Sequence, residues 1–130
     1  MKIDISTSGP RDPHYVLEVA EAFAQCARVL NHLTLSHEAL EFPGEAHDLL
    51  GYLAAAASCL PQLLDQVGDW YAAEAAAGRL RTDDGTDPYA RFTDLVASLD
   101  WPKVTAAQLQ SDLNTVTAIT VHLAAAEPVD

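Results

Sequence analysis

Leu-Leu-Gly-Tyr-Leu-Ala-Ala-Ala-Ala-Ser-Cys-Leu-Pro-Gln-Leu-Leu, residues 49–64, is the longest stretch of the 130-residue chain without a charged side chain. Alanine has the highest intrinsic helix propensity because it loses no side-chain entropy on folding. The stretch therefore predicts a helix that is apolar nearly all round and more buried than any other element. It is shorter than the roughly 20 residues that span a bilayer, which favours a buried helix over a membrane span.

The residues on either side extend this helix. We expect it to begin near Glu45 and the helical pattern to continue to about Ala77, with Gly78 as its C-cap. Pro61 interrupts the pattern, because proline lacks the N–H of a helical hydrogen bond and clashes with the preceding turn. The sequence leaves open whether Pro61 kinks one helix or separates two.

Further helices are marked by start and stop signals. Asp12-Pro13 and Asp87-Pro88 each place an N-cap residue before a proline at the first helical position. Trp101-Pro102 predicts the end of the helix that begins at Asp87-Pro88. Thr105 and Gln108 then have the spacing of a capping box for a last helix.

The sequence thus predicts an all-α protein, an antiparallel four- or five-helix bundle with an irregular N-terminal arm. Residues 1–11 form the arm, in which Ile3 and Ile5 alternate with charged residues, and residues 12–127 form a single helical domain. The long helical segments have similar lengths, which favours an antiparallel bundle. Leu30 and Leu113 are expected to lie in its core.

The charge balance is strongly acidic, with 19 acidic and seven basic side chains and a formal net charge of −12. Nucleic-acid binding requires clustered cations, and anionic membrane surfaces repel such a chain, so neither partner is expected. Cys26 and Cys59 both lie in apolar helical contexts and are expected to be reduced core thiols. No signal peptide is recognised at the N-terminus, and these features together predict a cytoplasmic protein.

The region from His32 to Asp48 is rich in potential metal ligands. His37 and Glu41 have a four-residue helical spacing, and His47 follows nearby. The known metal-binding spacings are absent, however, so no metal site and no cofactor is predicted, and these three residues are kept as candidates only. No catalytic residue set is recognised either, which favours a protein that is not an enzyme.

Trp70 and Tyr71 are adjacent aromatic residues near the middle of the segment after Pro61. Neighbouring side chains on a helix point about 100° apart, so the two rings cannot both face one narrow core stripe. We therefore expect this pair to contribute to an interface between proteins, where aromatic residues supply much of the binding energy. The alternative is that both rings rest on neighbouring helices.

The stretch Trp-Tyr-Ala-Ala-Glu-Ala-Ala-Ala-Gly-Arg-Leu, residues 70–80, followed by Asp-Asp-Gly at 83–85, resembles small Ala-rich helical proteins of high-GC actinobacteria. Many of those proteins are uncharacterised and some are encoded on plasmids or phages. The resemblance covers about a third of the chain. It implies a helical, cytoplasmic protein and supplies no catalytic residues.

The leading functional interpretation is a non-enzymatic helical bundle that acts through protein–protein contact, as a homodimer. One alternative is a bundle that binds a metal or a small molecule through the His32–Asp48 region. A second alternative is an acidic mimic of nucleic acid that blocks a basic DNA-binding protein. A mimic requires rows of carboxylates at phosphate-like spacing, whereas the acidic residues here are dispersed.

Overall fold

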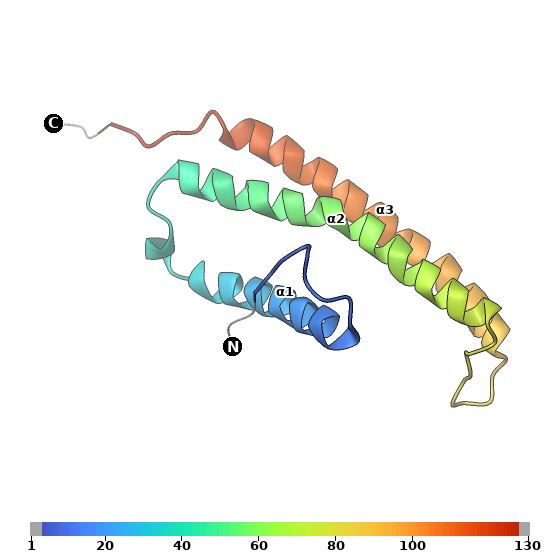
Figure 1. Cartoon of the computed structure of the whole chain (residues 1–130). Coiled ribbons are helices and arrows are strands. Elements are labelled where there is room, and N and C mark those ends of the chain that lie inside the picture. Colours follow the sequence, from blue (N-terminus) through green and yellow to red (C-terminus); the bar gives the residue numbers. More distant parts are fainter. Residues whose placement is uncertain (1–3, 128–130) are drawn as a thin grey trace. The chain divides into compact units, whose positions relative to one another are not determined.

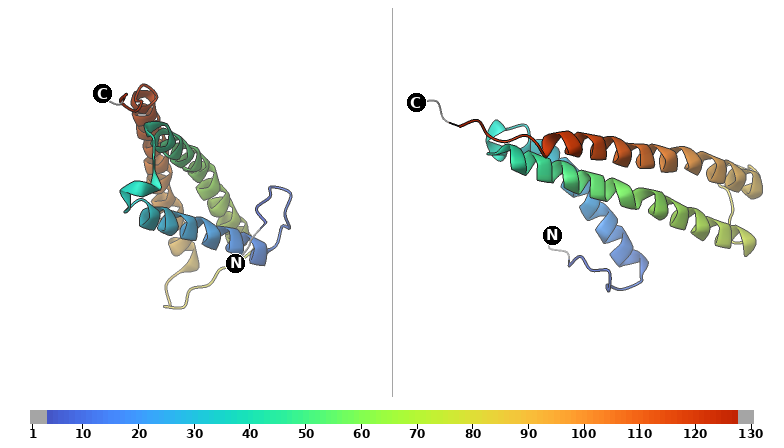
Figure 2. Two further views of the ribbon diagram at one scale, coloured as in Figure 1. Left: turned by 90° about the vertical axis from the view of Figure 1, so that its left-hand side faces the viewer. Right: turned by 90° about the horizontal axis from the view of Figure 1, so that it is seen from above.

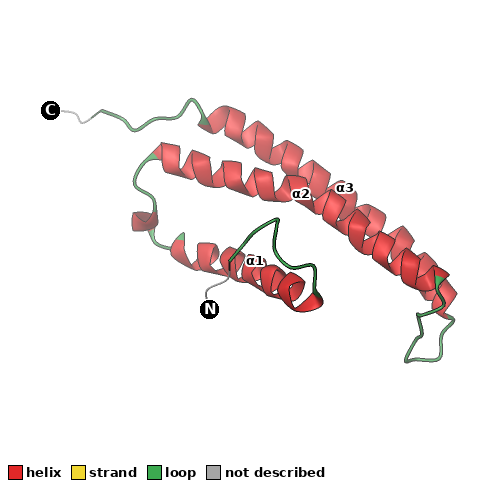
Figure 3. Ribbon diagram, viewed as in Figure 1, coloured by secondary structure: helices red, strands yellow, loops and turns green. Residues whose placement is uncertain are grey.

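The computed structural model describes residues 4–127, and every regular element in that range is helical (Figures 1 and 3). The elements are α1 (Pro13–Leu33), the short 3-10 helix η1 (His37–Ala39), α2 (Pro43–Ala76) and α3 (Pro88–Thr120). The prediction of an all-α protein is confirmed. The predicted count of four or five helices is wrong, since the described residues form three α-helices.

The chain divides into two compact units, Met1–Glu41 and Phe42–Asp130. The first contains α1 and η1, and the second contains α2 and α3. Each unit is described by itself.

The first unit begins with a folded segment held against the start of α1. The Tyr15 hydroxyl donates to the Asp4 carbonyl oxygen at 2.8 Å and accepts from the Ser6 N–H at 3.0 Å. Residues 4–11 contain no strand, and Ile5 is exposed. Ile3, the other residue of the expected alternation, lies outside the described residues. Asp12 caps α1 as predicted, because its carboxylate accepts from the Tyr15 backbone N–H at 2.8 Å.

The second unit is a helical hairpin whose ends follow from its sequence. Gly78 adopts a φ of 68°, the left-handed conformation that glycine accepts without a steric cost. The Arg79 N–H then donates back to the Glu74 carbonyl oxygen at 3.0 Å, the bond that defines a Schellman C-cap. Asp87 caps α3, because its side chain accepts from the Tyr89 N–H at 3.2 Å.

Two prolines account for the error in the helix count. Pro61 lies inside α2 and Pro102 lies inside α3, and both helices continue through them. Thr105 and Gln108 therefore cap nothing. The Gln108 side-chain amide instead donates to Asp112 within the same helix at 2.9 Å. An interior proline costs about 3 kcal/mol or more, so local propensity alone does not account for the continuous helices.

Helices α2 and α3 run antiparallel and lie side by side in all three views (Figures 1 and 2). Two contacts and one close approach fix their register. His47 Nδ1 lies 2.6 Å from Thr120 Oγ1, and Lys103 Nζ donates to Asp65 Oδ1 at 2.8 Å. A Cβ on Gly68 would lie 3.2 Å from Leu99 Cδ1, so the two helices approach closely at that point.

The contact between the helices follows a spacing of three and four residues, which we call the seam. Every position of the seam is buried or half-buried. On α2 the seam consists of His47, Leu50, Ala54, Ala57, Pro61, Leu64, Gly68, Tyr71 and Ala75. On α3 it consists of Phe92, Leu95, Leu99, Lys103, Ala106, Gln110, Leu113, Thr117 and Thr120. This is the spacing of two helices packed as in a coiled coil.

The seam buries only small side chains completely, and its large apolar residues are half-buried. Among the described residues only Ala54, Ala57 and Ala106 are buried. The expectation that Leu30 and Leu113 are core residues is wrong, because Leu30 is exposed and Leu113 is half-buried. The polar and small residues of the seam explain the thin core, since they bring the helices close together without a large side chain between them.

Candidate protein-interaction surface

Helix α2 carries a second apolar row beside its seam, which we call the outer stripe. Its members precede the seam positions by one residue and repeat at the same spacing of three and four. The outer stripe consists of Leu49, Leu53, Ala56, Leu60, Leu63, Val67 and Trp70. Four of these, Leu53, Leu63, Val67 and Trp70, are exposed by 41%, 52%, 41% and 58%. A helix with two adjacent apolar rows is typical of a bundle in which it contacts two neighbours.

Helix α3 adds apolar side chains on the same side of the hairpin. In an antiparallel pair, the residues that precede the seam positions on both helices face the same way. On α3 these include Leu109, Val116 and Ile119, all of them exposed. We call the outer stripe together with these three residues the apolar face.

The opposite side of the hairpin has a different chemistry. A shallow hollow of about 360 Å³ there is lined by small and polar residues. Its lining includes Gly51, Ala55, Ser58, Gln110 and Asn114. Ligand pockets are largely apolar, enclosed and supplied with converging polar groups, and this hollow is open. The apolar face is therefore the better candidate for a binding surface.

Trp70 and Tyr71 occupy the two rows of α2 separately, as the 100° rule requires. Tyr71 belongs to the seam and is half-buried, whereas Trp70 ends the outer stripe and is exposed. Their rings meet edge to face, with centroids 5.1 Å apart and planes at 86°. Such a pair stabilises the position of the exposed indole. Trp70 is therefore the more accessible of the two residues expected at an interface.

The candidate metal ligands are not gathered into a site. Within residues 4–127, no group of three or more His, Cys, Asp or Glu side chains is placed to hold a metal ion. His37 is part of η1 and Glu41 follows it in the first unit. His47 belongs to the seam of the second unit, where its ring contacts the Thr120 hydroxyl.

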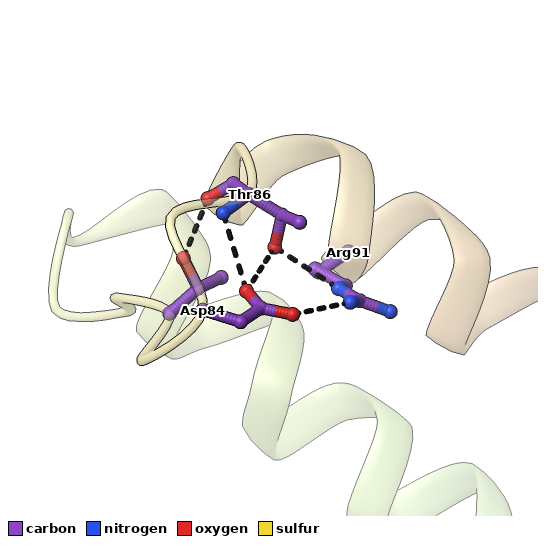
Figure 4. A network of polar contacts seen from close by, with 4 residues as sticks. Asp84, Thr86 and Arg91 are labelled. Atoms are coloured by element: carbon purple, nitrogen blue, oxygen red, sulfur yellow. Dashed lines mark hydrogen bonds and ion pairs between the residues drawn. The ribbon is translucent and has the colours of Figure 1, made fainter.

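The loop between α2 and α3 holds the densest polar network of the hairpin (Figure 4). Asp84 accepts from the Thr86 hydroxyl at 2.6 Å and from the Thr86 N–H at 3.2 Å, and it forms an ion pair with Arg91. These donors hold the pKa of Asp84 at about 2, below its ordinary value of 3.8, with the Thr86 hydroxyl as the largest cause. The network fixes the loop at the start of α3.

Lys103 is the one cation of the seam. It binds Asp65 across the hairpin at 2.8 Å and Asp100 on its own helix at 3.2 Å. These bonds raise the pKa of Lys103. The ion pair specifies which part of α3 lies beside which part of α2.

Both cysteines differ from expectation in one respect. Cys26 and Cys59 are free thiols, as predicted, but both are exposed rather than buried in a core. Apolar residues beside them, Phe23 near Cys26 and Leu63 near Cys59, are exposed as well.

Sequence analysis did not single out Leu53, Leu63 and Val67, although their spacing was readable. Their spacing was obscured because residues 49–64 are apolar nearly all round, so two rows separated by one residue look like a single broad face.

In the described part of the chain, no helix has the length and hydropathy of a membrane span. Comparison of the chain with protein-family models, curated proteins and solved structures finds no match.

Proposed function

We propose that this protein is a non-enzymatic helical module that acts through protein–protein contact and that it forms a homodimer. The observation that carries the proposal is the imbalance in burial within the hairpin. Three alanines are buried among the described residues, while large apolar side chains of the outer stripe remain exposed.

The energetics favour covering that surface. Complete burial of a Leu, Val or Phe side chain contributes about 1.5–3 kcal/mol relative to exposure, and the large apolar side chains of the hairpin are at most half-buried. A helical hairpin also loses backbone entropy at every residue that it orders. Association through the apolar face would supply the missing burial, as in obligate dimers whose interface resembles a core divided in two.

The composition supports contact with protein rather than with other partners. A net charge of −12 opposes binding to nucleic acid and to anionic membranes. The resemblance to Ala-rich actinobacterial proteins and the free thiols are consistent with a cytoplasmic location, which forms part of the proposal.

Light scattering after size-exclusion chromatography tests the proposal. The monomer has a mass of 13.9 kDa, and we expect twice that mass at micromolar concentration. A single mass of 13.9 kDa over a dilution series that reaches hundreds of micromolar would reject the homodimer.

A further inference from the structure

We propose that the outer stripe pairs with the outer stripe of a second copy, antiparallel and across a two-fold axis near Leu60, so that two hairpins form one four-helix core. This rests on the proposed homodimer and adds to it the surface, the orientation and the contacts. Two-fold pairing of identical surfaces is the commonest assembly of soluble chains.

The side chains next to the two-fold axis are complementary in size. Reversal of the stripe about Leu60 places Ala56 beside the partner's Leu63, a small residue beside a large one. The same reversal places Leu53 beside the partner's Val67, and Leu49 beside the partner's Trp70. Alternation of small and large residues across facing positions is what allows helices to interdigitate.

The charges also favour a second copy as the occupant. Each copy carries a formal charge of −12, so two copies repel each other except where carboxylates are absent. The centre of the outer stripe lies in residues 49–64, the longest uncharged stretch of the chain. A basic partner would instead require acidic residues across the middle of the contact.

The acidic residues in the middle of α2 lie outside this contact. Asp65 and Asp69 each follow a seam position, as do Gly51 and Ala55 of the hollow, so they lie on the side of α2 that faces away from the outer stripe. On α3, Asp94 and Asp112 interrupt the row that precedes the seam. Only α2 offers an unbroken apolar row, and the axis therefore lies on α2.

Disulfide cross-linking tests the orientation. Cys26→Ser and Cys59→Ser remove the native thiols, and Ala56→Cys and Leu63→Cys are then made in two separate chains that differ in mass by a tag. After the two chains are mixed at equal concentration and oxidised with copper–phenanthroline, we expect the mixed disulfide to exceed either homodisulfide several-fold. Homodisulfides in excess would indicate parallel pairing and would overturn the proposal.

Charge insertion tests the surface. Leu63→Glu is expected to weaken the dimer by on the order of 100-fold, because the carboxylate would be buried beside apolar side chains. The matched control is Val104→Glu, an exposed valine of α3 outside the apolar face, which should leave the dimer intact. Circular dichroism confirms that both variants remain helical.

The outcomes separate the two proposals. A dimer that survives Leu63→Glu and gives no mixed disulfide would mean that the homodimer exists but uses another surface. A parent chain that is monomeric at all concentrations would reject both proposals, since another part of the chain or a different protein would then cover the stripe.

Discussion

At the scale of single residues, the two caps carry clear local energies. Asp12 and Asp87 both satisfy a backbone N–H that the helix itself leaves unpaired. We expect Asp87→Ala to lower the free energy of unfolding by about 1 kcal/mol, and Asp87→Asn to lower it less. Urea denaturation followed by circular dichroism measures both. Asp83→Ala, an exposed carboxylate of the same loop, serves as control, and equal losses from Asn and Ala would indicate a role for charge alone.

Asp84 makes the loop sensitive to acid. Its pKa in the folded chain, about 2, is below the ordinary 3.8, so its carboxylate stabilises the fold above pH 3.8 and this contribution disappears as the pH falls through about 2. We therefore expect Asp84→Asn to flatten the dependence of unfolding free energy on pH between about 4 and 2. The effect should shrink in high salt, because the ion pair with Arg91 is exposed. An unchanged acid limb in Asp84→Asn would contradict this role.

At the scale of elements, Gly51 and Gly68, two of the three glycines within α2, differ in what surrounds them. A Cβ on Gly51 would meet nothing within 4 Å, whereas a Cβ on Gly68 would lie 3.2 Å from Leu99 Cδ1. Glycine costs a helix interior about 1 kcal/mol relative to alanine. We expect Gly51→Ala to stabilise the protein by about 0.5–1 kcal/mol and Gly68→Ala to stabilise it less, because the seam must open slightly. Thermal denaturation ranks the stability of the two variants. A larger gain in stability for Gly68→Ala than for Gly51→Ala would show that the seam has room for a methyl group beside Leu99.

Helix starts and ends were predictable where one residue determines them. Asp12, Asp87 and Gly78 act through their own side chain or backbone and keep that role in the structure. Pro61 and Pro102 were not predictable in the same way. The free-energy cost of a proline inside a helix argues for a break at each position. The continuous helices of the structure therefore depend on the whole α2–α3 seam and not on the residues next to each proline.

The candidate surface was predictable in part. The 100° separation of Trp70 and Tyr71 follows from helix geometry, and the structure places them on different rows of α2. The outer stripe could not be separated from the seam in the sequence, because every position in residues 49–64 except Gln62 is apolar or small. Only the position of α3 in the structure shows that α3 packs against the seam of α2 and leaves the outer stripe exposed.

At the scale of the whole molecule, stability and association are linked. Among its described residues the hairpin buries only alanines completely, and its large apolar seam residues stay half-buried, so part of the possible apolar burial is missing to set against the entropy of ordering its backbone. Charge adds to the difficulty, since the chain carries 12 excess negative charges that repel one another. Under the proposed function, association supplies the stabilisation that the single chain lacks, and folding then depends on protein concentration.

The most direct test of this account is the melting temperature as a function of protein concentration, followed by the helical circular dichroism signal. If a second copy completes the core, binding stabilises the folded state by mass action and the melting temperature rises steadily from about 1 to 100 µM. Leu63→Glu should lower the melting temperature and abolish this rise, whereas Val104→Glu should preserve it. A melting temperature of the parent chain that is the same at every concentration would contradict the central claim.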